Sequence, residues 1–374
     1  MSWNSHSLDQ LGYLSRGRSR HRPRDAAHLY GGEHPFIQTG DIKHAGLYIR
    51  DYEQTYSEAG LQQSRLWPAG TLCITIAANI ADTAILGIEA CFPDSVIGFI
   101  PDEKKADVRF VKYLFDATIQ QRVRQFTQGA AQENLSQEKL ISIEFSVPNV
   151  NEQKRIADIL SSYDTLIENN RRRMVLLEEA ARQLYREWFV RLRFPGHEHT
   201  RITNGVPEGW ERVPLGARVT LNYGKALKAE ERAEGPFPVY GSSGIIGAHD
   251  KALVTAPGIV VGRKGNVGSV YWCPMDYWPI DTAYYINGDT SNLWLFYALQ
   301  YMHFISTDVA VPGLNRDFAY SRPLLVPKQQ IIRDFLQTVT PLHAQILKLE
   351  EINQKLRGAR DLLLPRLMSG EIAV

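Results

Sequence analysis

Two long stretches of the sequence carry apolar side chains at the spacing of a coiled-coil helix. In the first stretch, intervals of four and three residues alternate from Ile156 to Trp188; a second series of this kind ends at Leu356. Apolar seams sustained over several heptads predict two long helices that pack against each other. Each seam contains one asparagine, Asn170 or Asn353, where a buried amide can fix the register of a helix pair. The alternative is that each helix packs only on its own neighbouring domain.

Each stretch also contains a residue suited to begin a helix partway along. Asp164 and Thr340 occupy equivalent places, and both are good N-cap residues. Pro341 follows Thr340 and suits the first helical position. We therefore expect a short helix, a cap or kink, and then a long helix in each stretch.

The two stretches belong to a longer internal repeat. Val147-Pro148 precedes the first stretch and Val326-Pro327 precedes the second. A repeat of about half the chain is too long for a solenoid and indicates two copies of a globular unit, each followed by a long helix. The residues matched at an offset of 176 are Gln153, Ile156, Asp158, Leu160 and Leu166 with Gln329, Ile332, Asp334, Leu336 and Leu342.

The segments that precede the helices have the pattern of α/β domains. Short β-branched and aromatic runs predict strands at 70–76, 258–262, 270–272 and 283–286. Longer apolar segments predict helices at 107–126 and 292–304. A Pro- and Gly-containing segment from Pro195 to Gly205 separates the two halves.

Composition narrows the function without defining it. The chain has 374 residues, with 42 Lys and Arg against 41 Asp and Glu, so contacts with a polyanion must come from local patches. Its three cysteines form no CxxC pair, which argues against a zinc site or a disulfide framework. The sequence has neither a signal-peptide pattern nor an apolar run of about 18 residues, so we expect a cytoplasmic protein without a membrane partner.

Several motifs resemble those of one family, the specificity (S) subunits of type I restriction–modification systems. The strongest are Pro148 with Glu152–Ala157, Leu184 with Trp188–Val190, and the closing Leu363–Glu371. Pro207 with Trp210, ahead of Leu215-Gly216, is typical of the start of a target-recognition domain. The resemblance implies two α/β target-recognition domains in a pseudo-twofold repeat, joined by two long helices in an antiparallel coiled coil. The corresponding ranges are 1–150 (first domain), 151–195 (first helix), 196–206 (linker), 207–327 (second domain) and 328–374 (second helix).

The resemblance also implies a function and a set of partners. Each domain would read one half of an asymmetric two-part site in double-stranded DNA, and the helices would set the spacer. The chain itself would be non-catalytic and hold no cofactor or metal. Two methyltransferase subunits and two restriction subunits would join it. The complex would then use S-adenosylmethionine, together with ATP and Mg²⁺ where restriction subunits are present.

The first candidate for DNA contact is the glycine-bounded turn 262–268, between two predicted strands. Its Arg263, Lys264 and Asn266 could reach phosphates or base edges because glycines allow the backbone to approach DNA closely. The equivalent turn of the first domain, 76–83, has no cation and offers Asn79. The alternative is an ordinary hairpin with solvated charges.

Further candidates lie on polar segments of both domains. An arginine-rich run near the N-terminus could track phosphates, although a solvated loop is the alternative. Asn134 and the pair Asn315-Arg316 stand just before the last strand of each domain. The resemblance implies that these positions lie near DNA. The candidates are Gln38 and Thr39; Tyr240, Ser242 and Ser243; Asn134, Asn315 and Arg316; and Arg18 and Arg20.

Other classes of function have weaker support. The sequence has no phosphate-binding loop with a lysine and no amino-methyltransferase motif. Asp94 followed by Glu103-Lys104-Lys105 has a nuclease-like pattern, but only its first part is echoed in the second half, by Asp276. The main alternative is a coiled-coil interaction scaffold whose globular ends bind protein rather than DNA.

Overall fold

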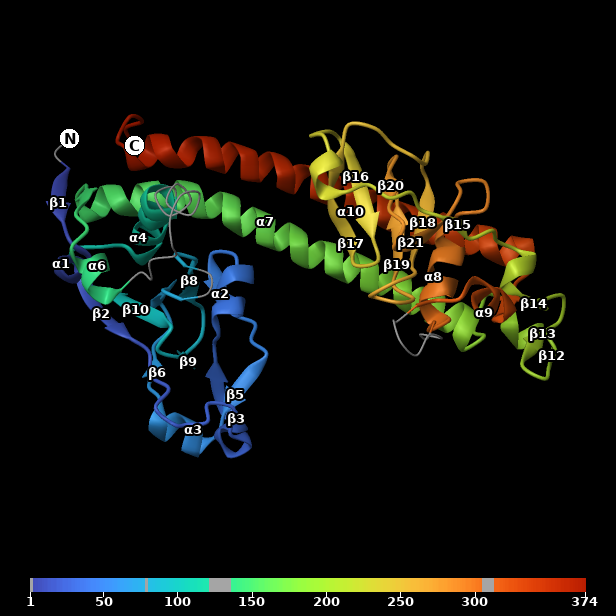
Figure 1. The fold of residues 1–374 in the computed structure, drawn as a ribbon, viewed down its shortest axis with the longest axis horizontal. Helices are drawn as coiled ribbons and strands as arrows, with labels where there is room; N and C mark the ends of the chain where they lie inside the picture. The colour runs from blue at the N-terminus through green and yellow to red at the C-terminus, as the bar shows by residue number, and fades with distance from the viewer. Residues whose placement is uncertain (1–2, 78–79, 121–135, 305–312) are drawn as a thin grey trace. The chain divides into compact units, whose positions relative to one another are not determined.

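The computed structural model describes residues 3–77, 80–120, 136–304 and 313–374. The chain forms two units, Met1–Arg172 with Leu349–Val374, and Arg173–Lys348. Each unit contains one α/β domain and a part of each of two long helices, α7 (Val150–Tyr185) and α10 (Gln329–Met368) (Figure 1). The predicted fold class, two α/β domains and two long helices, is confirmed.

The first domain is built on a five-stranded sheet in the order β2-β10-β7-β8-β4. Its central strands are buried along most of their length, which explains their nearly continuous apolar sequence. Two further sheets, β5-β3-β9-β6 and β1-β11, complete the domain. The strands are β1 (Asn4–His6), β2 (Gly12–Arg16), β3 (Tyr30–Phe36), β4 (Tyr48–Ile49), β5 (Gln54–Tyr56), β6 (Leu66–Trp67), β7 (Leu72–Thr75), β8 (Thr83–Leu86), β9 (Ala90–Cys91), β10 (Val96–Pro101) and β11 (Phe145–Val147).

The helices of the first domain are short. Asp107 begins α4 by accepting hydrogen bonds from the backbone N–H groups of Arg109 and Phe110, so a local cap sets that boundary. A π-helical turn, Asp116–Gln120, follows α4, and the rest of the predicted helix lies outside the described residues. The helices are α1 (Leu8–Leu11), α2 (Thr39–His44), α3 (Glu58–Gln63), α4 (Val108–Phe115) and α6 (Gln137–Ile141).

The second domain has a four-stranded sheet, β15-β21-β18-β19, and a three-stranded sheet, β17-β16-β20. Two small sheets, β12-β13 and β14-β22, lie in the same unit. The three strands predicted in this domain are present as β18, β21 and β19. The elements are β12 (Ile202–Thr203), β13 (Val206–Pro207), β14 (Glu211–Pro214), β15 (Asn222–Tyr223), β16 (Phe237–Gly241), β17 (Gly244–His249), β18 (Gly258–Gly262), β19 (Val270–Cys273), β20 (Trp278–Pro279), β21 (Ala283–Ile286), α8 (Leu293–Tyr301), α9 (Arg316–Ser321) and β22 (Pro323–Val326).

The internal repeat is present in the strand pairing. In the first unit β1 pairs with β11, the strand that precedes α7. In the second unit β14 pairs with β22, the strand that precedes α10. The turns 76–82 and 263–269 both connect neighbouring antiparallel strands, β7 to β8 and β18 to β19. The predicted equivalence of these two turns is confirmed.

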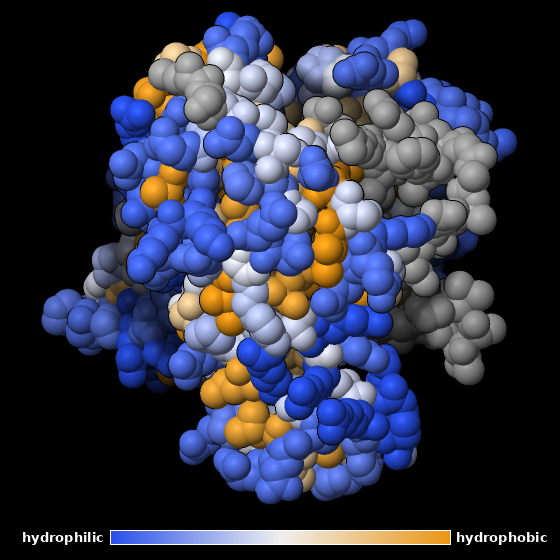
Figure 2. All heavy atoms as spheres, turned by 90° about the vertical axis from the view of Figure 1, so that its left-hand side faces the viewer, coloured by the Kyte–Doolittle hydropathy of each residue, from blue (hydrophilic) through white to orange (hydrophobic). Residues whose placement is uncertain are grey.

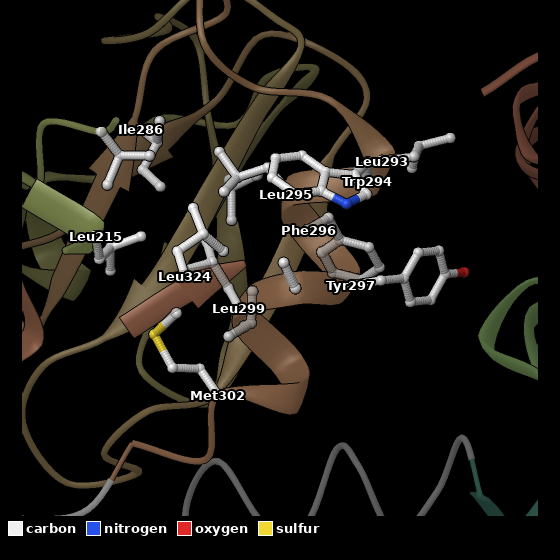
Figure 3. Close-up of a cluster of buried hydrophobic side chains, with 14 of the residues drawn as sticks. Leu215, Ile286, Leu293, Trp294, Leu295, Phe296, Tyr297, Leu299, Met302 and Leu324 are labelled. Carbon is white, nitrogen blue, oxygen red and sulfur yellow. The ribbon is translucent and has the colours of Figure 1, made fainter. Parts of the chain in front are cut away.

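Helix α8 provides much of the core of the second unit. Leu293, Leu295 and Leu299 are almost fully buried, and they pack in one cluster with side chains of the strands and of the long helices. Figure 3 shows α8 side chains together with Ile286 of β21 and Leu324 of β22. The predicted helix at 292–304 is confirmed by α8, which ends at Tyr301.

The two long helices lie side by side within each unit. In the first unit Asp164 of α7 pairs with Arg360 of α10, and Asn170 pairs with Asn353. As the residue number rises along α7, the residue number of the contacted residue in α10 falls. The two helices therefore run antiparallel, as predicted. In the second unit the ring centroids of Tyr185 and Phe335 lie 6.0 Å apart, and both side chains are buried.

The prediction of a cap or kink inside each long helix is wrong. Both α7 and α10 are continuous helices. The Asp164 carboxylate accepts hydrogen bonds from the Tyr113 hydroxyl and the Arg360 guanidinium, so it serves tertiary contacts rather than a cap. Pro341 lies inside α10, where it removes one backbone hydrogen bond without ending the helix.

The face of the molecule in Figure 2 is largely hydrophilic. Figure 2 shows one face of the molecule, on which hydrophobic residues appear in small groups between hydrophilic ones. Among the described residues, no helix combines the length and the apolar character needed to cross a membrane.

Candidate nucleic-acid interface

The last residue of β18, just before the turn to β19, lies where only glycine fits. A Cβ on Gly262 would lie 2.1 Å from the Asn266 carbonyl oxygen. The backbone N–H groups of Arg263 and Lys264 both donate to the Thr282 carbonyl oxygen, at 2.9 and 3.0 Å. These bonds tie the turn to the segment before β21, and Lys264 and Asn266 are exposed on it. The sequence therefore builds a fixed turn that presents its polar side chains to solvent.

The structure brings two predicted DNA-contact segments together around one polar pocket. Arg263 and Lys264 from the turn line it, as do Asn315 and Arg316 from the start of α9. The pocket has a volume of about 230 Å³ and is also lined by Tyr223, the last residue of β15. We call these five residues the basic pocket. Three of its side chains are cations, which is the chemistry that a phosphate or a guanine edge requires.

Tyr223 contacts two cations of the basic pocket and was not predicted from the sequence. The guanidinium carbon of Arg263 lies 4.9 Å from the centroid of its ring, and that of Arg316 lies 5.1 Å away. Tyr223 is 50% exposed, and its ring packs against that of Tyr284 at 5.1 Å. The available signal was an aromatic residue directly before Gly224-Lys225, which alone is too weak to identify a site.

Tyr284 forms the inner wall of the basic pocket. Its hydroxyl donates to the Leu314 carbonyl oxygen at 3.0 Å, which ties β21 to the residue before Asn315. Burial raises the pKa of Tyr284, and the neighbouring Tyr223 raises it further. The hydroxyl therefore stays protonated and remains a hydrogen-bond donor at neutral pH.

The two asparagines at this end of the domain differ in their contacts. The Asn315 side-chain oxygen accepts hydrogen bonds from the backbone N–H groups of Asp317 (2.8 Å) and Phe318 (3.0 Å), so it caps α9. This cap fixes the position of Arg316 in the first turn of the helix. The side chain of Asn266 is exposed. Its backbone carbonyl oxygen accepts a hydrogen bond from the Ser269 hydroxyl at 3.0 Å.

The candidates at 240–243 are only partly accessible. Tyr240 is 5% exposed and packs in a core cluster with Val260 and Tyr277, and burial raises the pKa of its hydroxyl. This burial argues against a direct base contact by Tyr240. Ser242 is also buried, whereas Ser243 is exposed in the turn before β17. Ser243 is therefore the accessible residue of this group.

In the first domain, the polar segment at Gln38 is the start of a helix. Gln38 precedes α2, and its backbone N–H donates to the Asp41 carboxylate at 2.7 Å. Its exposed side chain donates to Gln54 at 2.6 Å, and Thr39 is half-buried. Two other candidates, Asn79 and Asn134, lie outside the described residues.

The arginine-rich run is divided between internal contacts and solvent. Arg24 donates to both oxygens of Asp94, at 3.0 and 2.9 Å, and Arg22 donates to backbone carbonyls. Within the described part of the chain, the exposed side chains of Arg18 and Arg20 form no hydrogen bond or ion pair. These two arginines are the ones that remain available to a polyanion. Asp94 is also the first carboxylate of the nuclease-like pattern, and its ion pair with Arg24 engages both of its oxygens.

The helix pair contains the predicted asparagine contact. The Asn170 amide donates to the Asn353 side-chain oxygen at 2.9 Å, and Asn353 donates to the Ile167 carbonyl oxygen at 3.4 Å. Asn353 is completely buried. A buried amide pair of this kind is satisfied only when the two helices lie in this register.

Comparisons with known proteins agree with the geometry. The sequence model described as type I restriction modification DNA specificity domain matches residues 2–179 and 207–355. The chain is 23% identical to the type I restriction enzyme MjaIX specificity subunit of Methanocaldococcus jannaschii, over 100% of this chain and 94% of that protein. It is 29% identical to the EcoR124I/EcoR124II specificity subunit of Escherichia coli, over 37% of this chain and 38% of that protein.

A solved structure shows the same fold. It is the crystal structure of the type I restriction–modification S subunit from M. genitalium, with a TM-score of 0.59 and 19% identity. The match covers 98% of this chain and 96% of that chain. Because the family model matches both halves and most of the sequence, this chain belongs to the type I restriction–modification DNA specificity family.

Proposed function

We propose that this chain reads an asymmetric two-part site in double-stranded DNA, with one half-site for each domain. The observation that carries the proposal is the match of a DNA specificity domain to each half of the chain. The two domains have different side chains at equivalent turns, since the second has Arg263 and Lys264 where the first has no cation. Different turn chemistry would give two different half-sites.

In the second domain, the basic pocket would make the contacts to DNA. A guanidinium can donate two parallel hydrogen bonds to a guanine edge, so Arg263 is suited to reading sequence. A lysine ammonium is a compact point charge, so the exposed Lys264 is suited to a phosphate. In the first domain, Arg18 and Arg20 would track phosphates, and Gln38 and Asn79 would be candidates for base contacts.

The chain would act as the non-catalytic member of a larger complex. Its relatives are specificity subunits, and the described residues contain no group of three or more His, Cys, Asp or Glu side chains suited to a metal ion. Two methyltransferase subunits would supply catalysis with S-adenosylmethionine. Restriction subunits, where present, would add ATP- and Mg²⁺-dependent cleavage. The alternative of a scaffold that does not read DNA is not favoured, because both halves match the specificity domain.

The test is the methylated motif produced with a partner methyltransferase. The chain alone should methylate nothing, whereas the complex should methylate one two-part motif, read by methylation-aware sequencing. Arg263→Ala should cost about 1–3 kcal/mol of binding and relax one position of one half-site. Lys264→Ala should weaken binding to all DNA sequences alike. It should also lower the slope of log K against log salt concentration by about one.

A matched control separates these effects from a general loss of charge. Lys251 is an exposed lysine of the same domain that does not line the basic pocket. Lys251→Ala should leave both the motif and the affinity unchanged. Unchanged affinity and motif in the Arg263 and Lys264 variants would place the pocket away from DNA. Methylation by the purified chain without a partner would contradict the non-catalytic assignment.

A further inference from the structure

Two arginines of the basic pocket share one aromatic ring. The guanidinium carbons of Arg263 and Arg316 lie 4.9 and 5.1 Å from the centroid of the Tyr223 ring. Both distances are within the range of a cation–π attraction. The Asp317 carboxylate also lines the pocket, but within the described residues neither arginine forms an ion pair with it or with another carboxylate. The shared ring is thus the contact that joins the two cations.

Such an arrangement has a physical consequence for binding. Two neighbouring guanidinium groups repel each other, and each long side chain loses conformational freedom when it is fixed. The face of an aromatic ring attracts both cations without neutralising them, as a carboxylate would. Their donors therefore remain available to an anionic partner while their positions are restricted before binding. Preorganisation of this kind raises affinity by lowering the cost of ordering side chains.

Further contacts of both arginines and of Tyr223 support a fixed geometry of the three side chains. Arg263 Nη1 also donates to the Asp281 carbonyl oxygen at 3.1 Å. Arg316 lies in the first turn of α9, behind the Asn315 cap, and its guanidinium carbon is also 6.0 Å from the Tyr320 ring centroid. Tyr223 itself is held by strand pairing, since β15 is paired with β21 at Tyr284. The ring thus links two segments that are far apart in the sequence.

We propose that Tyr223 is a positioning residue that holds Arg263 and Arg316 as a preassembled pair for one anionic segment of DNA. The inference rests on the proposed DNA-reading function of the same pocket. Tyr223 acts through the two arginines rather than by contacting DNA itself. Its hydroxyl is dispensable, whereas its ring is required.

The DNA-binding test uses the complex of the full chain with its methyltransferase partner and duplexes that carry the methylated motif. Tyr223→Leu should weaken binding about tenfold, because both cation–π contacts are lost. Tyr223→Phe retains the ring and should stay within about twofold of the wild type. Adding Tyr223→Leu to an Arg263→Ala and Arg316→Ala background should cause no further loss, since residues that act as one unit are not additive.

A second readout needs no DNA. An arginine-specific dicarbonyl reagent modifies free guanidinium groups, and peptide mass spectrometry gives the rate at Arg263 and Arg316 separately. Both rates should rise in Tyr223→Leu and stay at the wild-type value in Tyr223→Phe. The exposed Arg20 of the first domain serves as an internal reference whose rate should not change.

The outcomes distinguish the positioning role from its alternatives. Equal weakening by the Phe and Leu variants would show that the hydroxyl matters, which overturns the proposal. A further loss from Tyr223→Leu in the arginine-free background would show direct contact between Tyr223 and DNA, which also overturns it. If the wild-type complex binds no DNA, the DNA-reading function fails. The modification rates then still decide whether Tyr223 positions the two arginines.

Discussion

At the residue scale, a tyrosine of each domain forms a hydrogen bond with the long helix that follows that domain. In the first unit the Tyr113 hydroxyl donates to the Asp164 carboxylate. In the second unit the Tyr297 hydroxyl and His343 Nε2 lie 2.9 Å apart. A polar contact inside a mostly apolar interface is satisfied in one geometry only, so each pair fixes the angle between a domain and its helix. The second pair contains a histidine whose pKa is lowered by burial, so this pair responds to pH.

The first prediction concerns the pH dependence of folding at His343. Burial lowers the pKa of His343 from 6.5 to about 4. Between these values the unfolded imidazole binds a proton and the folded one does not, so stability should fall as pH decreases through this window. Above pH 6.5 the side chain is neutral in both states and adds no slope. The full effect is at most about 3 kcal/mol, measured by urea denaturation of the chain at pH 7.5, 6 and 5.

Variants separate this effect from the other histidines. His343→Gln cannot titrate but can still accept a hydrogen bond from Tyr297, so its stability should decline less between pH 6.5 and 4. His44→Gln makes the same substitution at an exposed histidine of the first unit and serves as the matched control. If the His343 variant shows the same pH slope as the wild type, this histidine does not control acid stability.

At the element scale, the sequence predicted the features that depend on local pattern. The heptad seams predicted both long helices, and β-branched runs predicted β18 and β21. The expected cap at Asp164 failed because its partners, Tyr113 and Arg360, are distant in the sequence. Tyr223 was missed for the same reason, since β15 is a two-residue strand whose role depends on Arg263 and Arg316. Contacts made only by tertiary folding leave no periodic signal in the chain.

The second prediction concerns the asparagine pair between the long helices. Asn170→Ala would leave the side-chain oxygen of the completely buried Asn353 without its donor, at a cost of about 1–3 kcal/mol. Asn353→Ala would leave the amide of Asn170 without its partner, but Asn170 is only partly buried and can bond to water, so the lost hydrogen bond should cost less in this variant. Replacing both residues by leucine removes both polar partners and should restore most of the stability. Denaturant titration of the four proteins gives the comparison, and an Asn170→Ala variant as stable as the wild type would contradict the role of the pair.

At the scale of the whole molecule, the two specificity-domain matches predict modular reading. Replacing the first domain, up to Pro148, by that of a relative should change one half of the methylated motif and leave the other half intact. The physical reason is that each domain has its own sheets and its own core cluster, so its side chains are positioned independently. Methylation-aware sequencing of the host reads both halves at once. A wholly new motif after the exchange would contradict modular reading.

The last prediction is that the helix pair sets the spacer between the half-sites. A heptad preserves the phase of the apolar seam, so seven residues inserted near Asn170 and seven near Asn353 should lengthen both helices without disrupting their packing. The added length is about 10 Å at roughly 1.5 Å per residue. DNA rises about 3.4 Å per base pair, so the spacer should grow by about one to three base pairs.

The matched control adds four residues to one helix only. This insertion shifts the seam out of phase, separates Asn170 from Asn353, and should abolish assembly of an active complex. The decisive measurement is the methylated motif of the double-heptad variant. A folded and active complex with an unchanged spacer would mean that the helices do not set the distance, and that the spacing comes instead from contacts with the partner subunits.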